Sequence, residues 1–287
     1  MKSGEANTAA KQALAQATAH LNAGRPRQAE VLIRQVLQDE PDNHEAVNLL
    51  GMLALNTGHA PEAVELLSHA VQLQHREAEY HCNLGVALLT TNRAAEGEAA
   101  LLAALQLKPA HAMANFNLGL INLQHGRFED ARRNLEKAVR KMPQNPAALN
   151  ALGVAHSKCG KPAKALPLFR AVLEAQPNDL DTQLNLAGAL TEIGKTTEAV
   201  AHCEALLAGH PGQARLYFIL AVALSGAKRD LDAVEAYEQA LALEPEFIDA
   251  HVNLSALYAD RGGLDAALAH SKTACALKPN DVYRHGQ

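Results

Sequence analysis

Glycine, leucine and proline recur at the same positions every 34 residues, and this period constrains the fold more than any other feature of the chain. A leucine–glycine pair at positions 50–51 returns at 84–85, 118–119 and 152–153. A proline closes most of the repeats, at positions 109, 143, 177, 211, 245 and 279. Self-similarity at a fixed period of about 20–50 residues is typical of repeat arrays. The sequence therefore predicts one array, although 287 residues could form one or two conventional domains.

The period divides the chain without insertions. Eight repeats start at residues 10, 44, 78, 112, 146, 180, 214 and 248, between an N-terminal tail, residues 1–9, and a C-terminal tail, residues 282–287. The N-terminal tail is small and polar, and Asn7 or Thr8 is expected to cap the first helix. In each repeat the first half has the apolar periodicity of a helix.

A turn is expected at the fifteenth residue of each repeat. This residue is glycine in six repeats, and Asn92 or Lys228 in the other two. Glycine readily adopts the left-handed conformation that ends a helix, and asparagine tolerates it. A second helix follows, so that each repeat is predicted to be a helical hairpin. Pro167 lies inside the second helix of the fifth repeat, where a bend or a late helix start is expected.

One site in the second helix holds a small residue in every repeat. The eight residues at this site are Ala29, Ala63, Gly97, Ala131, Ala165, Ala199, Ala233 and Ala267. Together with the period, the leucine–glycine pair and the closing proline, this pattern resembles the tetratricopeptide repeat over 272 of the 287 residues. The resemblance implies an all-α solenoid of eight helix–turn–helix repeats in a right-handed superhelix, whose first helices line a concave groove.

Composition excludes several classes of function. The formal net charge is −5 and lysine and arginine form no run, so we expect no nucleic-acid binding. The four cysteines fall in different repeats without CxxC spacing, which argues against disulfides and zinc. No stretch of eighteen apolar residues occurs, so we expect no membrane insertion and a cytoplasmic location.

Motifs that resemble catalytic sites fail on spacing. Residues 188–196 read GALTEIGKT, but five residues separate the glycines where a phosphate-binding loop requires four. His44 and Glu45 begin a zinc-protease-like string, yet Asn48 stands where the second histidine ligand is required. We therefore expect no catalytic residue, no metal site and no cofactor, and the array is not expected to be an enzyme.

Asparagines mark the inner wall that the resemblance predicts. The sixth residue of the repeat is Asn83, Asn117, Asn185 or Asn253 in four repeats, and Asn48 and Asn150 occur one residue earlier in two others. The pattern is similar to the asparagine ladder of the tetratricopeptide superhelix of O-linked N-acetylglucosamine transferase, whose amides hold the backbone of an extended peptide. A carboxamide offers one acceptor and two donor hydrogens, which suits a peptide unit. The alternative is that asparagine serves helix packing at this site.

Apolar side chains accompany the amides on this wall. The predicted groove residues are Met113, Phe116 and Phe218, for which packing between repeats is the alternative. Because the wall is otherwise mildly acidic, it would favour a neutral or basic segment.

The sequence predicts a non-catalytic protein–protein interaction scaffold that binds an extended segment of a partner protein in its groove. The alternative is the substrate-recognition region of a larger glycosyltransferase or sulfotransferase. The last repeat would leave Leu268, Cys275 and Leu277 uncovered, so it is expected to dock another domain or a second copy.

Overall fold

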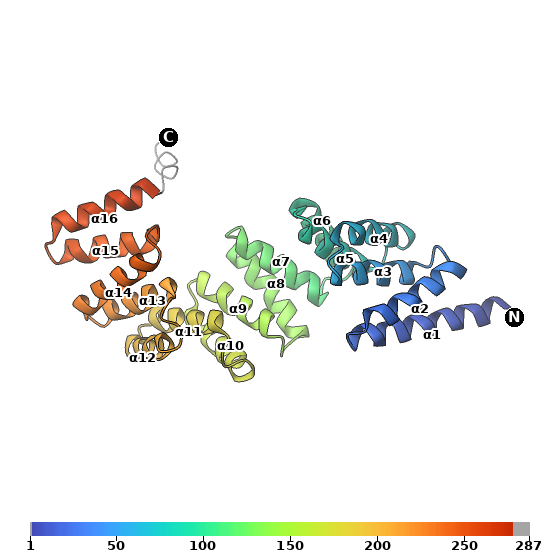
Figure 1. Ribbon diagram of the computed structural model, residues 1–287, viewed down its shortest axis with the longest axis horizontal. Helices are drawn as coiled ribbons and strands as arrows, with labels where there is room; N and C mark the ends of the chain where they lie inside the picture. The colour runs from blue at the N-terminus through green and yellow to red at the C-terminus, as the bar shows by residue number, and fades with distance from the viewer. Residues whose placement is uncertain (1, 278–287) are drawn as a thin grey trace. The chain divides into compact units, whose positions relative to one another are not determined.

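The structure is a computed structural model and describes residues 2–277. Within this part of the chain the regular structure is entirely α-helical, and sixteen helices follow one another, joined by short turns (Figure 1). Consecutive helices pack pairwise as eight helix–turn–helix repeats, which confirms the predicted all-α repeat fold. The predicted C-terminal tail, residues 282–287, lies outside the described residues.

The chain divides into two compact units, residues 1–148 and residues 149–287. The helices that lie in the first unit are α1 (Lys2–Asn22), α2 (Pro26–Asp39), α3 (His44–Asn56), α4 (Ala60–Leu73), α5 (Ala78–Thr90), α6 (Ala94–Leu107), α7 (Ala112–Gln124) and α8 (Phe128–Lys141). The boundary between the units falls inside α9 (Pro146–Lys158). The helices of the second unit that follow are α10 (Pro162–Ala175), α11 (Leu180–Glu192), α12 (Thr196–Leu207), α13 (Ala214–Gly226), α14 (Asp230–Leu243), α15 (Ile248–Asp260) and α16 (Leu264–Leu277).

The odd-numbered helices are the first helices of the repeats. From α3 onward each begins at the residue where the sequence period starts a new repeat. The first repeat departs from this rule, because α1 begins at Lys2, and the expected cap at Asn7 or Thr8 is wrong: both residues lie within the helix. Residues 2–9 contain no proline, and their alanines and glutamate favour helix enough to offset Gly4, so the helix extends through them.

The turn inside each hairpin has the predicted left-handed residue. Six glycines adopt positive φ at this position, with Gly24 at 67° as an example, and Asn92 (59°) and Lys228 (62°) adopt it as well. The next amide reaches back to a carbonyl five residues earlier, as in the bond of 2.9 Å from Arg93 N to Leu88 O. This geometry is the Schellman ending of a helix, which satisfies carbonyls that would otherwise lack donors. The sequence identified these turns correctly.

The leucine–glycine pair is explained by contacts within each hairpin. A Cβ placed on Gly51 would lie 2.7 Å from Cγ of Leu67, and one on Gly85 would lie 2.8 Å from Cγ of Leu101. Both leucines are fully buried in the second helix of the same repeat. The glycine therefore makes room for the buried leucine sixteen residues later, and this close approach builds the core of the hairpin.

Pro167 does not delay the second helix of the fifth repeat. α10 begins at Pro162 and continues through Pro167 to Ala175, so the expected late start is wrong. Pro162 occupies the first turn, where a helix loses nothing from the missing amide hydrogen. Buried Ala165, Leu166 and Phe169 hold α10 against the core on either side of Pro167, and this packing outweighs the lost backbone hydrogen bond.

Candidate functional site

A hollow of about 600 Å³ in the second unit is lined chiefly by the first helices α9, α11 and α13. We call it the second-unit hollow. Its apolar lining comes from Val154, Phe169, Leu184, Gly188, Ala189, Phe218, Ile219, Val222 and Phe247. Its polar lining comes from Ser157, Lys158, Asn185, Thr191, Glu192, Arg215 and Asp249. An apolar floor with a few polar groups at its edge is the usual composition of a ligand-binding cavity.

A chain of hydrogen bonds crosses three successive repeats beside this hollow. Nδ2 of Asn185 donates to Oδ1 of Asn150 over 3.1 Å, and Nη2 of Arg215 donates to Oδ1 of Asn185 over 2.9 Å. Asn185 therefore holds Arg215 in place through its acceptor while its donor is held by Asn150. No carboxylate within the described part of the chain forms an ion pair with Arg215, so its guanidinium keeps free donors at the edge of the hollow.

The charges of the second-unit hollow balance. Lys158 and Glu192 lie at its edge on α9 and α11, and Arg215 and Asp249 lie there on α13 and α15. Loss of hydration from partial burial raises the pKa of the Glu192 carboxyl above its ordinary value, although the Lys158 ammonium lowers it and the side chain still reaches solvent. With two cationic and two anionic side chains, the hollow has no net charge to attract an oppositely charged ligand.

Phe218 is held by two other rings. Its ring centroid lies 4.8 Å from that of Phe247 and 6.0 Å from that of Tyr237, the latter in an edge-to-face arrangement at 60°. Tyr237 is buried and Phe218 is half-buried. Phe218 therefore packs between repeats and also lines the hollow, and its contact with a peptide stays a prediction.

Most of the predicted asparagines already form hydrogen bonds with other residues of the protein. In the first unit Nδ2 of Asn83 donates to Oδ1 of Asn48 over 3.0 Å, and the two side chains are only 7% and 6% exposed. Nδ2 of Asn117 donates to the carbonyl of Met113 one turn earlier on α7. Asn253 bonds to the buried hydroxyl of Tyr237, whose pKa is raised by burial despite this bond.

The structure thus brings together a minority of the predicted site residues. Asn185 and Phe218 line the second-unit hollow, and Asn150 is bonded to Asn185. Met113 is 41% exposed and Phe116 half-buried on α7, in the first unit. The predicted groove residues did not include Gly188 and Arg215, which also line the hollow. The sequence did hold a signal for Gly188, because this glycine lies one residue after the glycine position of the leucine–glycine pair.

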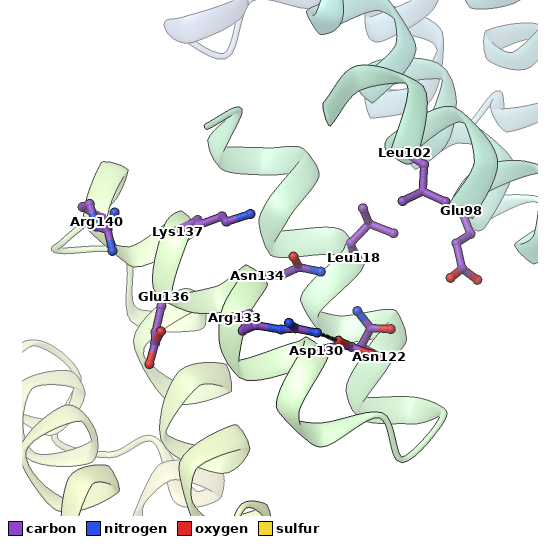
Figure 2. A pocket seen from close by; sticks show the side chains of 10 residues that line it. All are labelled: Glu98, Leu102, Leu118, Asn122, Asp130, Arg133, Asn134, Glu136, Lys137 and Arg140. Atoms are coloured by element: carbon purple, nitrogen blue, oxygen red, sulfur yellow. Dashed lines mark hydrogen bonds and ion pairs between the residues drawn. The ribbon is translucent and has the colours of Figure 1, made fainter. Parts of the chain in front are cut away.

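A second hollow, of about 500 Å³, lies in the first unit and is more polar (Figure 2). It is lined by α6, α7 and α8, and the side chains around it are Glu98, Leu102, Leu118, Asn122, Asp130, Arg133, Asn134, Glu136, Lys137 and Arg140. Figure 2 shows Arg133 paired with Asp130 across one turn of α8. Arg133 therefore has an acidic partner, and the apolar lining of this hollow is limited to Leu102 and Leu118.

The last described helix exposes apolar side chains on its outer face. Leu264 of α16 is 70% exposed and Leu268 is 54% exposed, and Cys275 is exposed as well. Leu277 is only partly exposed. The lack of cover over Leu268 and Cys275 is confirmed, and docking of another domain or copy at this face stays a prediction.

Residues 2–277 contain neither a metal-binding cluster nor a membrane-spanning helix. No group of three or more histidine, cysteine or acidic side chains is placed to bind a metal ion. None of the helices in this range combines the length and the apolar character needed to cross a bilayer.

The hairpins and the second-unit hollow define a helical-repeat protein whose first helices line a surface suited to binding. Two models of the tetratricopeptide repeat match the sequence, one at residues 82–146, 116–179 and 220–282, and the other at residues 20–84 and 157–221. The chain belongs to the tetratricopeptide repeat family. No curated protein is a significant match to the sequence.

Several solved structures share the fold. PilW, described as a widely conserved type IV pilus biogenesis factor, matches with a TM-score of 0.59 at 22% identity, over 74% of this chain and 98% of that chain. YrrB, described as a TPR protein with an unusual peptide-binding site, matches with a TM-score of 0.58 at 23% identity, over 65% of this chain and 96% of that chain. PilF from Pseudomonas aeruginosa matches with a TM-score of 0.55 at 22% identity, over 70% and 92% of the two chains. At these identities the likeness establishes the fold alone.

Proposed function

We propose that this protein is a non-catalytic scaffold that binds an extended segment of a partner protein, with the second-unit hollow as the principal contact. The single observation that carries the proposal is the lining of this hollow by the first helices of three successive repeats, with an apolar floor and a polar edge. A segment lying there would bury apolar area and hydrogen-bond at the edge, which together supply affinity. YrrB, of similar fold, is described as having a peptide-binding site.

The hydrogen bonds at the edge refine the role of the asparagines. Because Asn185 already bonds to Asn150 and Arg215, its contribution under this proposal is to orient the guanidinium of Arg215 toward the segment. A guanidinium with free donors can bind peptide carbonyls. In the first unit Asn117 is partly exposed and uses one amide hydrogen internally, so its second hydrogen and its amide oxygen are proposed to contact the peptide backbone, whereas Asn83 is buried.

The test is selection of binding peptides from a random-peptide display library, followed by affinity measurement by fluorescence polarisation. Replacement of Asn185 by alanine is expected to weaken binding of the selected peptides about 2- to 10-fold, because a hydrogen bond contributes about 0.5–1.5 kcal/mol net. Asn178→Ala is the matched control, since Asn178 is exposed in the turn before α11 and does not line the hollow.

The outcomes separate clearly. Selected peptides that bind the Asn178→Ala protein normally and the Asn185→Ala protein weakly would support the proposal. If the library yields no binding peptide, or if both variants bind as tightly as the unaltered protein, the second-unit hollow is not the principal contact. Circular dichroism on both variants checks that the helices are intact.

A further inference from the structure

Gly188 is a glycine in the middle of a helix for which the packing of the hairpin gives no reason. Glycine destabilises a helix interior relative to alanine, so its presence there needs a cause. At Gly51, Gly85 and Gly119 the cause is a buried leucine within 2.5–2.8 Å of the position a Cβ would take. At Gly188 a Cβ would meet no atom within 4 Å, and its φ is not in the left-handed region that favours glycine.

The empty position opens into the second-unit hollow. Gly188 lines it together with Val154, Phe218 and Val222, which are half-buried and have apolar surface facing the space. Phe218 is held by Phe247, so this part of the lining is firm. Binding of an apolar group in such a space is favourable, because it displaces water from apolar surface. The missing side chain at position 188 therefore leaves room for a side chain from another molecule.

The charges at the edge restrict what can enter. Lys158 and Arg215 together are offset in charge by Glu192 and Asp249, so the hollow as a whole has no net charge to attract a charged side chain. A charged group placed on the apolar floor would lose its hydration at a distance from the charged side chains of the edge, which is costly. An uncharged apolar side chain has no such cost, and its backbone can bond to the free donors of Arg215.

We propose that the second-unit hollow selects one large aliphatic or aromatic side chain, flanked by uncharged residues, within the extended segment, and that Gly188 determines this specificity by leaving the space open. The inference rests on the proposed function, since it names the chemistry of the segment that the same hollow binds. It assigns to Gly188 a role in recognition that the repeat pattern does not require.

The test uses the full chain and a random-peptide display library with three proteins: unaltered, Gly188→Leu and Gly212→Leu. Gly212 is the matched control, because it lies in the second unit outside the hollow, and a Cβ there also meets no atom within 4 Å. The unaltered protein and Gly212→Leu are expected to enrich peptides with leucine, isoleucine, methionine or phenylalanine at one position. Replacing that residue by alanine is expected to weaken their affinity about 10-fold or more, the effect of burying one large apolar side chain.

Gly188→Leu places an aliphatic side chain in the space beside position 188, so it is expected to lose this enrichment, and the alanine replacement in the peptide is expected to change its affinity by less than about two-fold. Gly188→Ala, which adds one methyl group to a helix, is the second variant if leucine disturbs the fold. Enrichment that persists in both Gly188 variants, or selected peptides without a preferred apolar residue, would overturn the inference and leave peptide binding intact. Failure to select any peptide on the unaltered protein would overturn the proposed function instead.

Discussion

Replacement by alanine is expected to have opposite effects on the free energy of unfolding at two glycines of first helices, Gly119 in α7 and Gly188 in α11. A Cβ on Gly119 would lie 2.5 Å from Cγ and 2.7 Å from Cδ2 of Leu135, whereas carbon atoms pack at about 3.5–4.0 Å. Leu135 is fully buried, so it can move away only by displacing its own neighbours. Overpacking of this kind costs about 1–3 kcal/mol.

The helical preference for alanine acts at both positions. It contributes about 0.5–1 kcal/mol relative to glycine in a helix interior. At Gly119 this gain offsets only part of the overpacking, so the free energy of unfolding is expected to fall by about 1–2 kcal/mol. At Gly188 the methyl group enters open space, so the free energy of unfolding is expected to rise by about 0.5–1 kcal/mol.

Urea unfolding followed by far-ultraviolet circular dichroism measures the two changes, and amide hydrogen exchange locates them in α7 and α11. Local exchange is the decisive measurement, because repeats contact mainly their neighbours and need not unfold together. The reasoning is refuted if Gly119→Ala is as stable as the unaltered protein, or if Gly188→Ala lowers the protection of amides in α11.

Two further predictions concern pH and thiol reactivity. Nδ1 of His251 lies 2.9 Å from Nδ1 of His270. Burial lowers the pKa of His270 below 6.5, and the neighbouring His251 lowers it further by a smaller amount. His270 therefore binds fewer protons in the folded state than in the unfolded state. The stability contributed by the neutral His270 is therefore present above pH 6.5 and lost as the pH falls through its folded pKa; the urea midpoint should drop between about pH 7.5 and pH 5.5, and less so in His270→Gln. Burial also raises the pKa of the Cys82 and Cys203 thiols to about 12, so an aromatic disulfide reagent at about pH 8 should modify exposed Cys275 first and these two only after unfolding, as mass spectrometry would show. Rapid modification of Cys82 or Cys203 in the folded protein, or an unchanged urea midpoint across this pH range, would contradict the respective prediction.

The sequence predicted the hairpins because their determinants are local. The left-handed residue at each turn, including Asn92 and Lys228, follows from one position in the period. The sequence failed in two places: α1 extends to Lys2 because no proline before Ala10 ends the helix, and α10 runs through Pro167 because packing of buried neighbours overrides the local effect of the proline.

The candidate site was only partly predictable. Asn185 and Phe218 were named from their positions in the repeat, and both line the second-unit hollow. Their partners could not be foreseen, because the bond from Asn185 to Asn150 spans 35 residues and depends on how one hairpin packs on the next. The same pairing occurs between Asn83 and Asn48, so amides of neighbouring repeats bond to one another.

Period, turn chemistry and small-residue sites, all readable along the chain, determined that this protein is a tetratricopeptide array of eight hairpins. Tertiary structure alone decided which inner-wall side chains remain available. Gly119 and Gly188, which occupy adjacent positions of the repeat, illustrate the reason. Leu135 of the same hairpin fills the space beside Gly119, whereas the space beside Gly188 belongs to an open hollow. A sequence specifies that a side chain is absent, but only the packing of neighbouring helices determines what occupies the space it leaves.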